Sequence, residues 1–172
     1  MNPPQLYTAS VPVFQRYLRQ LSLMLDAAQA EVTKGRVNEA QLLEARLAPD
    51  MLPLHLQVQI AAGFVLRACA PLQGLPVPPL GSPAPGLAGL QALLRERQSD
   101  LDALPAEAFR GAEARVIDSD AGRAQLQLPA TEFLQHFALP NFFFHLSCAY
   151  ALLRQSGVPL GKQDFDGLHR YR

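Results

Sequence analysis

The last long apolar stretch of the chain, residues 139–157, reads LPNFFFHLSCAYALLRQSG. We expect this stretch to be one helix with a clear C-terminal end. Arg154 suits the last turn, Gly157 is placed for a left-handed cap, and Pro159 blocks continuation. The earlier Pro140 interrupts helical hydrogen bonding. It therefore predicts either a kink or a new helix beginning there, with backbone carbonyls released near His136 in both cases.

Two polar residues lie one turn apart on this helix. At about 100° per residue, Asn141 falls about 40° and Cys148 about 60° from His145, all on one side of the helix. We expect this face to point into the core. The opposite face carries Phe143, Leu146 and Tyr150. A helix that is apolar nearly all round must be covered on more than one side.

The first half of the chain predicts three further helical segments. One follows Tyr7, with Thr8 or Ser10 as its cap, and ends near residues 34–35. A short one lies within residues 37–47, with Asn38 as its cap. A long one covers about residues 51–73 with Asp50 as its cap, and its inner stripe contains Val58, Ala62, Val65 and Cys69. His55 falls within about 40° of that stripe, where a hydrogen-bonded core histidine is the commoner role.

A proline-rich segment separates these helices from the rest. Residues 71–85 carry too many prolines and glycines for a regular helix, so we expect a crossover between the two ends of a bundle. The next helix covers about residues 86–103. Its leucines predict an inner face, and the charged residues, including Arg95 and Arg97, are expected to face outward.

Alternation replaces helical spacing after Gly111. Residues 115–128 contain a turn signal, Asp120-Ala-Gly122, followed by Leu126 and Leu128 between glutamines. They predict a β-hairpin, which either covers the outer face of the last helix near Phe143 and Tyr150 or leaves that face to a second subunit. The terminal segment from Pro159 to Phe165 is expected to fold back onto the bundle.

The length and composition of the chain limit the classes of protein to which it can belong. The chain has 172 residues, with 15 basic and 15 acidic side chains, which suits a single domain over residues 1–172. The absence of a basic cluster argues against a nucleic-acid or anionic-membrane partner. Neither a signal peptide nor an apolar run of membrane-spanning length is evident, so we expect a cytoplasmic location. The two cysteines are then simplest as buried thiols.

Five stretches resemble an uncharacterised bacterial family. They are ASVPVF (9–14), ARLAPDM (45–51), QVQIA (57–61), LPNFFFH (139–145) and GVPLGKQDF (157–165), of which the last two are the most specific. That family is placed in the DinB/YfiT-like superfamily of four-helix bundles. The resemblance spans nearly the whole chain. It implies an all-α, DinB-like bundle with up-down-down-up helix directions and a long crossover, often dimeric. The hairpin expected from residues 115–128 is then an insertion before the last helix of this bundle.

The wider superfamily also implies a site. It includes metal-dependent thiol transferases and hydrolases, in which a histidine on the second helix joins a His-x-x-x-His pair on the fourth. By this resemblance His145 matches the second histidine of the pair, Asn141 replaces the first, and His55 lies near the second-helix ligand. Zinc or nickel bound by His55, Asn141 and His145 would then be held more weakly, since asparagine is a poor ligand for such ions.

Two classes of function follow, and the sequence does not decide whether the protein is an enzyme. One is a small-molecule-binding or structural role, with Asn141 and His145 as a polar pair that fixes packing or lines a pocket under the crossover. The other is a metal-dependent enzyme of the thiol transferase or hydrolase type that uses His55 and His145. In a mechanism without metal, His145 would act as a general base oriented by Asn141. A small-molecule ligand and a homodimer are the expected partners.

Overall fold

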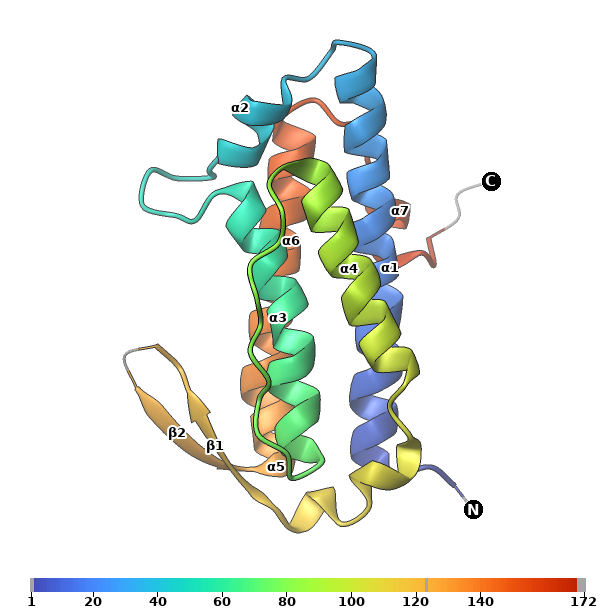
Figure 1. The fold of residues 1–172 in the computed structure, drawn as a ribbon, viewed down its shortest axis with the longest axis vertical. Helices are drawn as coiled ribbons and strands as arrows, with labels where there is room; N and C mark the ends of the chain where they lie inside the picture. The colour runs from blue at the N-terminus through green and yellow to red at the C-terminus, as the bar shows by residue number, and fades with distance from the viewer. Residues whose placement is uncertain (1, 123, 170–172) are drawn as a thin grey trace.

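Four long helices form the body of the molecule in a computed structural model of the chain, which describes residues 2–122 and 124–169. They are α1 (Gln5–Thr33), α3 (Leu54–Leu72), α4 (Gly86–Asp102) and α6 (Leu139–Gln155). Figure 1 shows α1 running up, α3 and α4 down, and α6 up. The expected bundle topology is therefore confirmed. None of the helices in the described residues is long and apolar enough to cross a membrane.

The core follows the predicted helical spacing. On α1 the residues Phe14, Leu18, Leu21, Leu25 and Ala28 are fully buried, because their three-to-four spacing keeps them on one face of the helix. The expected start was wrong, however, since α1 begins at Gln5 after Pro4. The Thr8 hydroxyl donates backward to the carbonyl of Gln5 at 2.8 Å and caps nothing.

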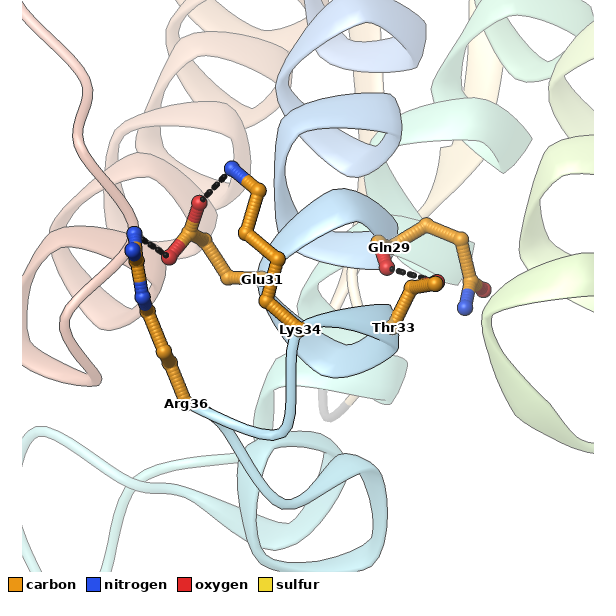
Figure 2. A network of polar contacts seen from close by, with 5 residues as sticks. All are labelled: Gln29, Glu31, Thr33, Lys34 and Arg36. Carbon is orange, nitrogen blue, oxygen red and sulfur yellow. Dashed lines mark hydrogen bonds and ion pairs between the residues drawn. The ribbon is translucent and has the colours of Figure 1, made fainter.

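A buried carboxylate closes the turn after α1. Glu31 accepts hydrogen bonds from Lys34 Nζ at 2.7 Å and Arg36 Nη1 at 3.3 Å, as Figure 2 shows beside the separate bond from Thr33 to the Gln29 carbonyl. The Lys34 bond is the largest influence that lowers the pKa of Glu31, and the Arg36 bond adds to it. This Glu31 clasp holds the chain as it turns toward α2.

The short second helix, α2 (Glu39–Glu44), is capped as expected. The Asn38 side chain accepts from the backbone N–H of Gln41 at 3.0 Å. Its first residue also serves another helix, because the Glu39 carboxylate accepts from the backbone N–H of Leu87 at 2.7 Å and so caps α4. The prediction that Asp50 caps α3 was wrong, since α3 follows Pro53.

The proline-rich crossover, residues 73–85, runs the length of the bundle beside α3 and returns the chain to the start of α4 (Figure 1). Its fit is tight at both of the glycines beneath it. A Cβ atom on Gly63 would lie 3.1 Å from Leu80 Cδ1, and one on Gly89 would lie 1.7 Å from the Ala84 carbonyl oxygen. The path of the crossover therefore requires glycine at position 89, where the obstacle is backbone, whereas at position 63 it is only the end of a side chain.

Helix α4 buries one charged residue that the sequence placed outside. Its leucines face the core as predicted, but Arg97 is only 5% exposed. The guanidinium donates to Asp100 at 2.6 Å and to Glu96 at 2.7 Å. The prediction failed because the crossover covers this side of α4, which would otherwise be open to water.

Two short 3-10 segments, η1 (Ala106–Phe109) and η2 (Ala112–Ala114), lead to the expected hairpin of β1 (Val116–Asp120) and β2 (Gln125–Pro129). The strands are antiparallel, and Ile117 is paired with Leu128. Arg67 on α3 donates to the Asp120 carbonyl oxygen and ties the hairpin to the bundle. Figure 1 shows the hairpin projecting beside the lower end of α3 and α6.

Helices α1 and α7 (Lys162–Asp166), and not the hairpin, cover the outer face of α6. Phe143 packs edge-on against Tyr17 of α1, with 4.8 Å between ring centroids. Tyr150 packs against Phe165 at 5.5 Å, and Phe165 lies in α7. The expectation that the hairpin covers Phe143 and Tyr150 was wrong. The fold-back of the terminal segment is confirmed, because its aromatic side chain completes this cluster.

Pro140 lies in the first turn of α6, which begins at Leu139, as one of the two expected alternatives has it, but the residues before it are helical as well. A turn of α-helix, α5 (Ala130–Glu132), passes through a π-helical segment, η3 (Phe133–Ala138), directly into α6. The wider i to i+5 hydrogen bonding of a π-helix accommodates the missing N–H of Pro140.

The inner face of α6 agrees with the expected one only in part, since Cys148 is buried as expected but Asn141 and His145 are not. Its fully buried residues are Phe142, Leu146, Ala149, Leu152 and Leu153, whereas Asn141 and His145 are half-buried. The polar pair thus lies at the border between the core and the surface.

Candidate functional site

His145 is held by a residue of the neighbouring helix. Its Nδ1 lies 2.7 Å from Oε1 of Gln57 on α3, and Gln57 is only 1% exposed. The amide of Gln57 is itself fixed, since Nε2 donates to the carbonyl of Leu52 at 3.1 Å. The oxygen facing His145 can only accept, so Nδ1 carries the proton and Nε2 is left as an acceptor in the neutral ring.

The surroundings of His145 favour that neutral ring. Burial is the larger cause that lowers the pKa of His145, and the positive charge of Arg67 lowers it further. The imidazole stacks on Phe64 with 6.2 Å between ring centroids and meets Phe144 edge-on at 5.2 Å. These contacts and the Gln57 bond fix the orientation of the ring.

The second ring nitrogen of His145 reaches the surface. Every fully buried side-chain nitrogen or oxygen of the described residues has a hydrogen-bond partner. Nε2 has none within that part of the chain. It is therefore accessible to water, and a neutral imidazole with one nitrogen anchored and the other accessible can accept a proton or bind an electrophile.

Asn141 is on the same side of α6 but has a different partner. Its Nδ2 donates to the Phe137 carbonyl at 2.7 Å, four residues back, where the π-helical segment meets α6. Gln57 thus holds the His145 ring by a hydrogen bond, while Asn141 binds the helix backbone. Gln57 was not predicted as a site residue from the sequence. The available signal was a second stripe of apolar residues on α3, Ala61, Phe64 and Ala68, which surrounds the Gln57 position in helical projection.

His55 lies on the other side of α3. Its Nδ1 is 3.0 Å from the Leu43 carbonyl oxygen and 3.5 Å from the Glu44 carboxylate, both of α2. Residues 55 and 57 differ by about 200° around a helix, so His55 and the Gln57–His145 pair face in nearly opposite directions.

The donor set for a metal ion can be judged from this arrangement. Among the residues that the structure describes, no three His, Cys, Asp or Glu side chains gather as metal ligands. As oriented here, His55 and His145 face away from each other and do not fit a shared ion. A metal held by His55, Asn141 and His145 stays a prediction.

Two hollows lie beneath the crossover. A hollow of about 620 Å³ opens between α3, α4 and the first half of the crossover. A smaller one of about 180 Å³ lies nearer the N-terminal end of α3. Arg97 lines both. We call them the large hollow and the small hollow. Neither is lined by Asn141 or His145.

These features define a DinB-like four-helix bundle with a groove beneath its crossover and a histidine, His145, held between α3 and α6. A crystal structure of a DinB family member protein from Shewanella denitrificans superposes with a TM-score of 0.83 at 30% sequence identity, over 97% of this chain and 94% of that one. The chain belongs to the family described as "Domain of unknown function (DUF1993)", whose model matches residues 6–166. No curated protein matches the chain.

Proposed function

We propose that the protein binds a small molecule in the groove beneath the proline-rich crossover. The observation that carries the proposal is the large hollow. Its volume of about 620 Å³ lies within the range of ligand sites, roughly 300–1,000 Å³. The crossover supplies one wall and the helices α3 and α4 supply the others.

The lining suits a ligand with an apolar body. Leu66, Ala70, Leu75 and Leu104 give apolar walls, and Gln73 offers an amide. Leu75 is 56% exposed although it lies over the groove. An exposed leucine above an open apolar hollow loses contact with water when a ligand fills the space, which favours binding.

A fragment screen by protein-observed NMR tests this role. We expect neutral ring-containing fragments to shift the backbone signals of Cys69, Ala70 and Leu75, and the substitution Ala103→Trp to reduce their affinity at least about tenfold by filling the exposed edge of the large hollow. Ala30→Trp, on the exposed side of α1, is the matched control and should leave binding unchanged. Fragments that bind equally well to both variants would refute the proposed location.

His145 supports a second candidate, an enzyme that uses this ring as a general base. The supporting observation is the anchored, neutral imidazole with an accessible Nε2. The metal-dependent form of this candidate, of the thiol transferase or hydrolase type, requires an ion at His55, Asn141 and His145. Elemental analysis of protein purified without chelator tests it: near-stoichiometric metal that disappears in both His55→Ala and His145→Ala supports it, and metal-free protein that takes up no added divalent ion refutes it.

Homodimerisation and a cytoplasmic location also stay proposals. Sedimentation of the purified protein over a range of concentrations tests the first, since a dimer of this chain has twice its mass of 18.8 kDa.

A further inference from the structure

We propose that the small hollow binds the carboxylate of a small acid whose body is apolar. This inference rests on the proposed binding function and names the chemical class of the ligand. The two charged residues that line the small hollow are both arginines, Arg67 of α3 and Arg97 of α4. Its other walls are mostly apolar, with Leu56, Ile60 and Leu80 among them, and Gln59 adds an amide.

The carboxylates that pair with Arg97 do not line the small hollow. The two partners of Arg97, Glu96 and Asp100, have side chains that are 62% and 39% exposed, whereas the Arg97 side chain is 6% exposed. Water screens the two carboxylates more than it screens the guanidinium. Glu96 and Asp100 also line the large hollow and not the small one. The small hollow is therefore the positive end of the groove.

Both arginines retain donors for a ligand. A guanidinium has five N–H groups. Arg97 uses Nη1 and Nη2 for Asp100 and Glu96, and Arg67 uses Nη2 for the Asp120 carbonyl. Within the described residues Nε of Arg97 has no partner, and since no fully buried nitrogen there is unpaired, this N–H is accessible to solvent.

The arginines are also held in place before any ligand arrives. The Arg67 guanidinium lies over the Phe64 ring, 4.6 Å from its centroid, while its other contact fixes it to the hairpin. The two carboxylates fix Arg97. Donors that are already ordered lose little conformational entropy on binding, which favours a planar carboxylate held by paired N–H groups.

The volume limits the size of the acid. The small hollow measures about 180 Å³, and an apolar cavity of about 150 Å³ can hold benzene. Benzoate is therefore a suitable probe, and benzamide is its neutral counterpart of nearly the same shape.

Titration of the full chain by NMR, observing the backbone and the arginine Nε–H signals, tests the inference. We expect benzoate to bind at least about tenfold more tightly than benzamide and to shift the signals of Arg67 and Arg97. Arg67→Gln should weaken benzoate binding about tenfold. Arg95→Gln, which removes an exposed charge from α4, is the matched control and should not weaken it.

Several outcomes would overturn the inference. One is equal affinity for benzamide and benzoate, and another is that benzoate changes only NMR signals distant from both arginines. In either case the proposed binding function stands if neutral fragments still occupy the large hollow. If neither hollow binds any fragment, both proposals fail. Should Arg67→Gln not fold, the ratio of benzoate to benzamide affinity in the unmodified protein decides.

Discussion

Gln57 and His145 are joined by a 2.7 Å hydrogen bond that connects α3 to α6 at the border of the core. The bond fixes which ring nitrogen carries the proton, because the Gln57 amide is anchored by the Leu52 carbonyl. One buried glutamine thus determines the chemical character of the histidine, and the same bond contributes to the packing of two helices.

Replacing Gln57 by leucine should lower the free energy of unfolding by about 1–3 kcal/mol, because the substitution leaves the Nδ1–H group of His145 without its acceptor. Chemical denaturation measures the change. Gln59→Leu is the matched control, since the Gln59 side chain has no hydrogen bond within the described residues, and its effect should stay within about 0.5 kcal/mol. Equal effects of the two substitutions would contradict a stabilising role for the Gln57–His145 bond.

His145 should make stability depend on pH near neutrality. Burial lowers its pKa in the folded chain below the ordinary value of about 6.5, so the unfolded chain binds the proton more readily. The stabilisation is therefore present above about pH 6.5 and is lost as pH falls toward the folded pKa. Melting temperatures measured from pH 7.5 down to about 5.5 should fall less steeply for His145→Gln than for the unmodified protein. Parallel curves for the two proteins would show that His145 has no part in this dependence.

The Glu31 clasp should contribute stability that acid removes. Lys34 and then Arg36 hold the pKa of Glu31 below its usual range, so the contribution is present above the unfolded value of about 4.3 and is lost as pH falls through the folded value. We expect Glu31→Gln to be less stable than the unmodified protein at neutral pH and the difference to shrink in acid. Glu113→Gln, at an exposed position, should change little at either pH. A deficit for Glu31→Gln that persists unchanged in acid would argue for a packing role instead.

Gly89 and Gly63 should respond differently to alanine. Alanine favours helix over glycine by roughly 0.5–1 kcal/mol at each site. At Gly89 the new Cβ would meet a backbone oxygen of Ala84 at 1.7 Å, and we expect a net loss of about 3 kcal/mol or more. At Gly63 the obstacle is the end of the Leu80 side chain at 3.1 Å, which can rotate away, so the net change should stay within about 1 kcal/mol. Denaturation midpoints of the two variants measure this, and a well-tolerated Gly89→Ala would mean that the crossover lies elsewhere in solution.

Much of the fold could be predicted from local signals. Helical spacing placed Phe14 and Val65 in the core, the prolines of residues 71–85 required a crossover, and the alternation near Leu128 gave the hairpin. Each of these signals depends on neighbours within a few residues. Cover of the outer face of α6 was mispredicted, because it depends on where Phe165 returns from the far end of the chain.

The candidate sites were harder to predict for the same reason. The four-residue spacing of Asn141 and His145 follows from one helix. The partner of His145 is Gln57, 88 residues away, and only the packing of α3 against α6 brings them together. The burial of Arg97 likewise depends on the path of the crossover, which composition indicates but does not trace.

The π-helical segment before α6 keeps residues that recur every four positions on the same face of the helix. Leu134, Ala138, Phe142 and Leu146 are all fully buried, although they recur every four residues. In a regular α-helix each such step drifts by about 40°, so Leu134 and Leu146 would end about 120° apart. The wider turns of residues 133–138 absorb part of this drift. Deleting one residue from this segment would let it relax into an ordinary α-helix and rotate the hairpin around the helix axis relative to His145. The number of residues in the π-helical segment therefore sets the angle about the helix axis between the hairpin and His145.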